Sequence, residues 1–161
     1  MNRPRIQISA TLAALALLTP NCLAGGRPEA CDSGSLKGAY AMTITGTRPA
    51  PRVLPDFPGV APGTIEQVIG VFIQVFDGAG LISHAENVTV KGSLSGLFPD
   101  QPGTGTYTIN PDCTGSFTVN LPQVPAPLVN RMVVLRRGKE FRSVVISPQT
   151  LMINVTAARV N

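Results

Sequence analysis

Residues 103–121 read Gly-Thr-Gly-Thr-Tyr-Thr-Ile-Asn-Pro-Asp-Cys-Thr-Gly-Ser-Phe-Thr-Val-Asn-Leu, and this stretch predicts the fold class of the chain. Threonine and apolar residues alternate on both sides of its centre, which is the period of a β-sheet with one face in water. The central Asn-Pro-Asp predicts a tight turn, because proline fixes a backbone dihedral and Asn and Asp side chains bond their own backbone. The apolar face of this hairpin is expected to carry Tyr107, Ile109, Phe117, Val119 and Leu121.

The composition of the whole chain favours the same class. Its 161 residues include 16 Gly and 15 Pro, and only 14% are charged. Many turn residues together with 43% apolar residues suit an all-β domain and exclude a disordered chain. No basic stripe with interleaved aromatic residues occurs, so the sequence gives no argument for a nucleic-acid partner.

The N-terminus has the pattern of a secretory signal peptide over residues 1–24. Arg3 and Arg5 precede an apolar run over 6–18, and Ala24 is a small residue suited to cleavage. The run is shorter than the ~20 apolar residues of a stable membrane span. We therefore expect a secreted or periplasmic protein whose single domain covers residues 25–161.

Removal of the signal peptide leaves two cysteines, Cys31 and Cys113. In a secreted domain such a pair most simply forms a disulfide, which here would tie the N-terminal segment to the hairpin turn. A reactive or metal-binding thiol is the alternative, but two cysteines and the single His84 lack the ligand spacing of a zinc site. We expect no metal and no cofactor. Lipidation of Cys22 is a further alternative, although Asn21 is larger than the residue that such a site takes before its cysteine.

The same alternation predicts strands on either side of the hairpin. Together with its two arms they make eight: 36–47, 64–76, 81–91, 129–137, 141–147 and 150–160, joined by turns and by a proline-rich loop over 48–63. Eight strands in hairpin order predict a closed antiparallel barrel, because closure removes both sheet edges. A β-sandwich is the alternative, but sandwiches usually need several long connections.

The strand predicted over 64–76 is apolar on both faces. Ile65, Ile69 and Val71 lie on one face, and Val68 and Phe72 lie on the other. One face should meet the core. The other face must be covered by something else, and a homo-oligomer would cover it.

Three segments, in chain order, carry a family resemblance: Ser-Leu-Lys-Gly-Ala-Tyr at 35–40, Phe-Asp-Gly-Ala-Gly at 76–80 and Gly-Thr-Tyr-Thr-Ile-Asn-Pro-Asp-Cys-Thr-Gly at 105–115. Together they resemble small secreted bacterial proteins related to the allene oxide cyclase barrel. The resemblance implies an eight-stranded calycin-type barrel with an apolar lumen open at one end. Plant members of that family cyclise an unstable fatty-acid epoxide, and barrels of similar build fold reactive polyenes in their lumen.

His84 and Glu86 are the most interesting polar pair. They are two residues apart on a predicted strand, so their side chains share a face, and the apolar phase of Ile82 and Val88 places that face inside. A histidine beside a carboxylate can act as an acid–base pair. The alternative is a bulge that shifts the phase and leaves both residues in water or at the rim. The phase rule places three further polar residues in the lumen, Tyr40, Tyr107 and Arg159, the last of which is alternatively a solvated chain end.

The expected function is the binding of a small apolar or amphipathic molecule in the lumen. A barrel cyclase or isomerase is the first alternative, and an interaction barrel that oligomerises is the second. A lumen smaller than ~300 Å³ would favour the second alternative. The chain carries no nucleophile elbow, phosphate loop or dinucleotide fingerprint, so the sequence leaves open whether it is an enzyme.

Overall fold

The computed structural model describes residues 30–50, 61, 63–84, 89–94, 96–99, 102–122 and 124–160. This part of the chain contains the 3-10 helices η1 (Ser33–Ser35) and η2 (Arg136–Gly138) and the strands β1 (Lys37–Pro49), β2 (Ile65–Asp77), β3 (Leu81–His84), β4 (Thr89–Gly92), β5 (Gly96–Pro99), β6 (Thr104–Ile109), β7 (Thr114–Asn120), β8 (Leu128–Leu135), β9 (Glu140–Ser147) and β10 (Met152–Arg159). No helix within these residues is long and apolar enough to cross a membrane. The predicted signal peptide over 1–24 lies outside them.

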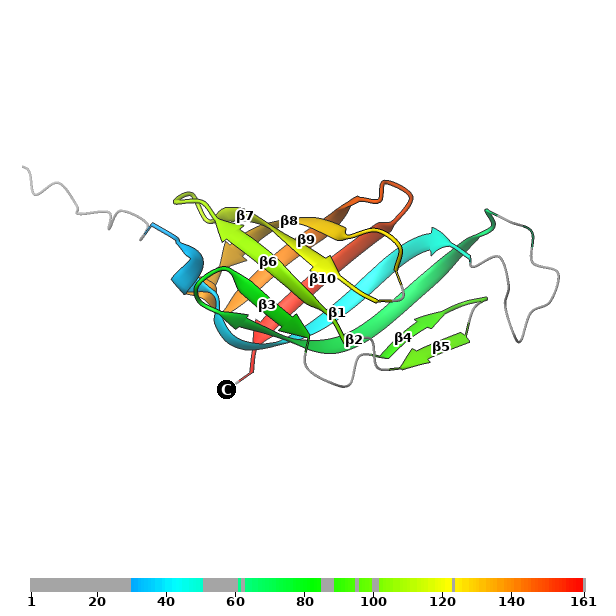
Figure 1. Ribbon diagram of the computed structural model, residues 1–161, viewed down its shortest axis with the longest axis horizontal. Coiled ribbons are helices and arrows are strands. Elements are labelled where there is room, and N and C mark those ends of the chain that lie inside the picture. The colour runs from blue at the N-terminus through cyan, green and yellow to red at the C-terminus, as the bar shows by residue number, and fades with distance from the viewer. Residues whose placement is uncertain are drawn as a thin grey trace, which may run out of the picture.

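Eight of the strands close into an antiparallel barrel (Figure 1). The sheet runs in the order β1-β10-β9-β8-β7-β6-β3-β2, and β2 pairs again with β1. This confirms the predicted eight-stranded barrel. The β-sandwich alternative is wrong, because β1 has a hydrogen-bonded partner on each side and the sheet has no gap there.

The longest ladder of the barrel joins β1 and β2. All 13 residues of β1 pair with β2, from Lys37 opposite Asp77 to Pro49 opposite Ile65. The strand therefore runs two residues into the proline-rich loop that was predicted to begin at residue 48. Residues 51–60 and 62 of that loop lie outside the described part of the chain.

A single strand over 81–91 is a wrong prediction. β3 ends at His84, and β4 pairs with a different part of β2. β2 is long enough for two partners in turn, because its residues 74–76 pair with β3 and its residues 68–71 pair with β4. β4 and β5 form a hairpin beside the first half of β2 (Figure 1), and β5 lies between the predicted strand over 81–91 and the hairpin over 103–121, where no strand is predicted.

The two ends of the barrel differ. We call the plugged end the one at which η1, η2 and the turns 78–80 and 110–113 lie, and the distal end the one at which β1, β7 and β9 finish. Five aromatic rings pack together inside the barrel toward the plugged end: Tyr40, Phe76, Tyr107, Phe117 and Phe141. Their ring centroids lie between 5.0 Å (Phe76–Tyr107) and 6.0 Å (Phe117–Phe141) apart, mostly edge to face. Such pairs each add about 0.5–1.5 kcal/mol beyond the burial of their area.

The two faces of β2 differ in their exposure to solvent. Val68 and Phe76 are buried in the core, which confirms that one face of this strand meets the interior. Ile65, Ile69 and Val71 point outward and are 61%, 55% and 56% exposed. A homo-oligomer that covers this outer face stays a prediction.

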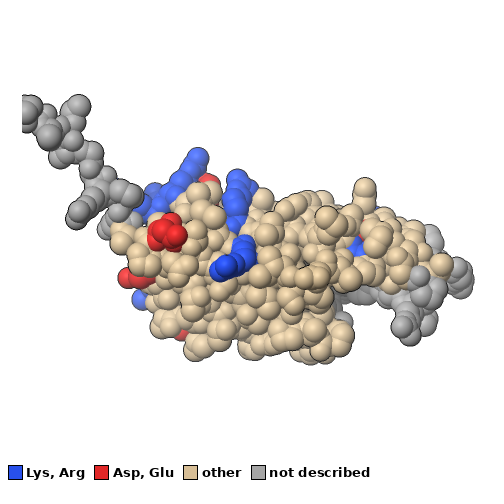
Figure 2. All heavy atoms as spheres, turned by 90° about the horizontal axis from the view of Figure 1, so that it is seen from above, with Lys and Arg blue, Asp and Glu red and all other residues tan. Residues whose placement is uncertain are grey.

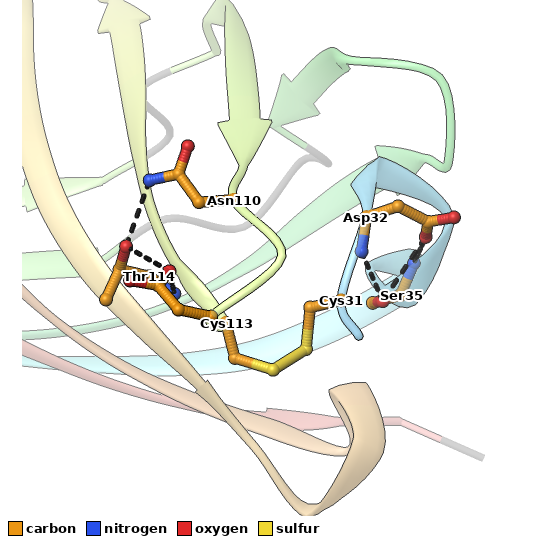
Figure 3. Close-up of a disulfide and its surroundings, with 7 residues drawn as sticks. Cys31, Asp32, Ser35, Asn110, Cys113 and Thr114 are labelled. Atoms are coloured by element: carbon orange, nitrogen blue, oxygen red, sulfur yellow. Dashed lines mark hydrogen bonds between the residues drawn. A yellow bond between two sulfur atoms is a disulfide. The ribbon is translucent and has the colours of Figure 1, made fainter. Parts of the chain in front are cut away.

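A disulfide joins Cys31 to Cys113, as the sequence predicts (Figure 3). The backbone N–H of Cys31 also donates to the carbonyl of Pro111 at 3.2 Å, so the N-terminal segment is held to the hairpin turn twice. Within the turn, the Asp112 carboxylate accepts hydrogen bonds from the hydroxyl and the backbone N–H of Thr114, at 2.7 and 3.0 Å. These bonds hold the pKa of Asp112 below its ordinary value of 3.8.

Replacing both cysteines by serine should lower the stability of the fold. The disulfide links residues 82 positions apart, so its removal frees a long loop in the unfolded chain and should cost up to about 4 kcal/mol. The measurement is the free energy of unfolding in urea. The wild-type protein under reducing conditions is the control and should match the double variant. Equal stability with and without the disulfide would contradict the prediction.

Candidate functional site

The plugged end is closed by η1 and the residue that follows it. Leu36 is fully buried against the aromatic cluster. The Tyr107 hydroxyl lies 2.9 Å from the carbonyl oxygens of both Ser33 and Leu36, and it donates to this pair. A capping box between Asp32 and Ser35 holds the same short helix (Figure 3). Side chains from β6 and from the N-terminal segment thus seal the barrel together.

A second hydroxyl fixes the turn between β8 and β9. The Tyr40 hydroxyl donates to the carbonyl of Gly138 and accepts hydrogen bonds from Nε and Nη2 of Arg159, at 3.2 and 2.9 Å. Arg159 Nη2 also donates to the carbonyl of Ser35 at 3.1 Å. Gly138 has φ +77°, and a Cβ at this position would lie 1.8 Å from the Ser35 carbonyl oxygen, so the close approach requires glycine.

The electrostatics of this end follow from its burial. Burial raises the pKa of Tyr40 above its ordinary value of 10.0, and the hydrogen bond from Arg159 offsets only part of that rise. Burial also raises the pKa of Tyr107. Both hydroxyls are therefore protonated at neutral pH and can donate to the backbone carbonyls that they face.

The structure brings together three of the five predicted pocket residues. Tyr40, Tyr107 and Arg159 meet at the plugged end, where their polar atoms bond the backbone of η1 and η2. Contact between a ligand and these side chains stays a prediction. His84 ends β3 in register with Gln74. The side chain of His84 and all of Glu86 lie outside the described part of the chain, so the acid–base pair also stays a prediction.

Three other polar residues point into the barrel, and the sequence analysis missed them. Gln74 is 0% exposed, Asn130 3% and Ser143 6%. Within the described part of the chain, neither the nitrogen nor the oxygen of the Gln74 side chain has a hydrogen-bond partner, and the same holds for Asn130 Oδ1 and Ser143 Oγ. A buried polar group left unpaired costs about 1–3 kcal/mol, so each of these atoms is expected to have a partner.

The strand registers show where these groups lie. Gln74 of β2 is flanked by Tyr40 of β1 and by His84 of β3. Ser143 is the fourth residue of β9, and Asn130 is the third residue of β8, which begins at the distal end. Gln74 therefore lies beside Tyr40 in the plugged-end half of the barrel, Ser143 lies midway along its strand, and Asn130 lies toward the distal end. An amide, a hydroxyl and a carbonyl oxygen in this region can donate to and accept from a carbonyl, hydroxyl or carboxyl group.

A buried ion pair lies nearer the distal end. Glu66 is 1% exposed, and its Oε1 lies 2.7 Å from Nε of Arg48. Its other oxygen accepts the backbone N–H of Leu94 at 3.0 Å. The pair therefore ties β1 and β2 to the segment that follows β4. A buried carboxylate with these bonds stabilises local geometry as long as both partners are present.

A sequence signal for these residues exists. Glu66 and Gln74 share the inward phase of Val68 and Phe76 on β2. They were not predicted as site residues, because their neighbours on that strand are apolar. A polar residue at an inward position of an apolar strand marks either a satisfied core group or a ligand contact. Only the hydrogen bonds in the structure separate Glu66, which is satisfied, from Gln74, which is not.

The fold defines the class of this protein as a closed, eight-stranded antiparallel β-barrel. No known protein family, curated protein or solved structure matches the chain. The closed eight-stranded barrel agrees with the resemblance to the allene oxide cyclase family, and membership of that family stays a prediction.

Replacing Tyr40 by phenylalanine should destabilise the barrel by about 1–3 kcal/mol, because the Gly138 carbonyl loses its donor inside the protein. The raised pKa fixes the pH dependence. The folded hydroxyl keeps its proton where the unfolded one ionises, so the contribution of Tyr40 is complete below pH 10.0 and decreases above it. Urea unfolding of both proteins across this range measures the difference in free energy. If the difference in free energy of unfolding stays constant as the pH rises past 10.0, Tyr40 is not the buried donor to the Gly138 carbonyl.

Proposed function

We propose that this protein binds a small apolar or amphipathic molecule inside the barrel, and that a polar group of the molecule bonds to Gln74. The observation that carries the proposal is the fully buried Gln74 side chain, whose two polar atoms have no hydrogen-bond partner among the described residues. Asn130 Oδ1 and Ser143 Oγ likewise lack a hydrogen-bond partner that a bound molecule could supply. A ligand with a hydroxyl, carbonyl or carboxyl group would form hydrogen bonds with these buried atoms.

The closure of the plugged end supports entry of a ligand into the barrel from the distal end. The aromatic cluster and the Tyr107 hydroxyl close the other end, and Leu36 covers it. The inward neighbours of the polar groups are apolar, as in the case of Met42 and Val119. A molecule with an apolar body and a polar group therefore suits this interior. Lumenal sites in small barrels commonly combine an apolar lining with a few placed polar groups.

The interaction barrel with a filled interior fits these observations less well, because it would leave the Gln74 amide without a partner among the described residues. A cyclase or isomerase of the allene oxide cyclase type would use the same lumen. In that case His84 would act as a proton-transfer group, which its register position opposite Gln74 favours. Binding is common to both, so we propose binding as the function and leave turnover as the alternative.

The disulfide supports an exported protein. Disulfides persist in oxidising compartments, and Cys31–Cys113 fixes the plugged end of this barrel. Together with the signal pattern over residues 1–24, the disulfide leads us to propose that the mature protein is secreted or periplasmic. No metal or cofactor is part of the proposal.

The Gln74→Leu variant tests the binding proposal. Leucine keeps the approximate volume and removes the amide, so the variant should unfold at a higher temperature than the wild type while binding less well. Loss of one hydrogen bond of about 1 kcal/mol corresponds to roughly fivefold weaker binding. The readouts are the mass of any molecule that co-purifies with the protein in native mass spectrometry, and the affinity for the neutral dye N-phenylnaphthylamine.

Thr156→Val is the matched control, because it also replaces a polar residue but on the outer face of β10. It should leave the dye affinity and the co-purified mass unchanged. Equal dye binding by the wild type and Gln74→Leu, with no co-purified molecule in either, would refute the proposed lumenal site.

A further inference from the structure

Two adjoining depressions lie on the outer surface of the barrel along β9. The first has a volume of about 540 Å³ and is lined by Asn110, Thr114, Arg131, Val133, Arg142 and Val144 among others. The second has a volume of about 610 Å³ and is lined by Val144, Ile146, Gln149, Leu151, Met152 and Asn154 among others. Val144 lines both, so the two depressions adjoin, and we call the pair the β9 groove. It runs from the hairpin turn at the plugged end to the turn between β9 and β10.

The plugged-end half of the β9 groove is cationic. Arg131 is opposite Val144 and Arg142 is opposite Val133, so the two arginines are diagonal neighbours on β8 and β9. Such neighbours lie about 7–8 Å apart. Both are exposed, and neither forms an ion pair with a described residue. In Figure 2 most of the lysine and arginine side chains on the face shown lie toward the plugged end, with acidic side chains beside them.

Neither of two acids at this end forms an ion pair with these arginines. Glu140 is paired with Arg136 at 2.9 Å, and the Asp112 carboxylate, which keeps its negative charge, accepts hydrogen bonds from Thr114. Arg131 and Arg142 therefore keep their side chains available for an anionic ligand. Two guanidinium groups at this spacing match a carboxylate, which arginine binds through paired hydrogen bonds.

The other half of the β9 groove is apolar. Val144 is 44% exposed, Ile146 45% and Met152 72%. Val133, beside the arginines, is 46% exposed. From Arg142 to Ile146 the strand advances by about 13 Å, so the apolar side chains extend away from the charges in one direction.

We infer that the β9 groove is a second binding site, which takes a single-chain anionic amphiphile of the fatty-acid class. The carboxylate binds between Arg131 and Arg142, and the acyl chain lies over Val144, Ile146 and Met152. A polyanion without an apolar part would leave these exposed side chains uncovered. A groove rather than a protruding surface favours one chain over a bilayer.

This site is separate from the proposed lumenal site. Arg131 alternates along β8 with the inward Asn130, and Arg142 alternates along β9 with the inward Ser143. The two sites thus use opposite faces of the same strands, and each can be altered alone.

The test is the affinity of the purified full chain for dodecanoate at low ionic strength, measured by isothermal titration calorimetry. The double variant Arg131→Gln/Arg142→Gln should weaken binding at least about tenfold, because it removes two charge-assisted contacts. Ile146→Ser/Met152→Ser should weaken it by a similar factor through lost apolar contact. Lys37→Gln/Lys91→Gln is the charge-matched control, because it removes two cations outside the groove and should leave the affinity unchanged.

Gln74→Leu separates the two sites, because it removes the proposed lumenal contact and leaves the groove intact. Dodecanoate that binds in the lumen is lost in this variant, whereas the binding that the double arginine variant removes should remain. Several results would overturn the inference. They are equal dodecanoate affinity in the wild type and the double arginine variant, loss of dodecanoate binding in Gln74→Leu alone, or binding of acetate as tight as that of dodecanoate. Capture of heparin or of phosphatidylglycerol vesicles through these arginines, without dodecanoate binding, would show that the partner belongs to another class.

Discussion

The continuous pairing of β1 with β2 is the constraint on which the rest of this structure depends. Its 13 residue pairs close the sheet into a barrel and fix which face of each strand points inward. Once Tyr40 and Met42 face the interior, their ladder partners Gln74 and Phe72 must face it as well. The same phase forces the other apolar face of β2 outward. One ladder therefore explains both the buried Gln74 amide and the exposed valine and isoleucines of β2.

The plugged end combines covalent, polar and apolar contacts. The disulfide holds the N-terminal segment, Tyr107 binds η1, and Tyr40 joins η2 to Arg159. Three distant parts of the chain therefore meet and close this end. The proposed ligand would enter the interior from the distal end. The arginines of the β9 groove lie on the outer surface of β8 and β9, toward this end of the barrel.

Much of the fold could be predicted because its strands alternate. The phases of Tyr107, Phe117 and Val119, the eight-stranded closure and the cysteine pair all follow from residue patterns and are confirmed. The break after His84 could not be predicted, because residues 81–91 alternate without interruption while β2 offers two pairing segments. The candidate site was harder to find. A lone glutamine on an apolar strand looks like any core polar residue until its missing hydrogen bonds are seen in three dimensions.

The state of the Gln74 side-chain amide tests the central claim most directly. Its two amide protons can be assigned in nitrogen–proton correlation spectra by comparing the wild type with Gln74→Leu, before and after extraction of the protein with organic solvent. The account predicts that these protons exchange slowly with water in the protein as purified, and that their signals shift when the bound molecule is removed. Fast exchange and unchanged signals in both samples would contradict it.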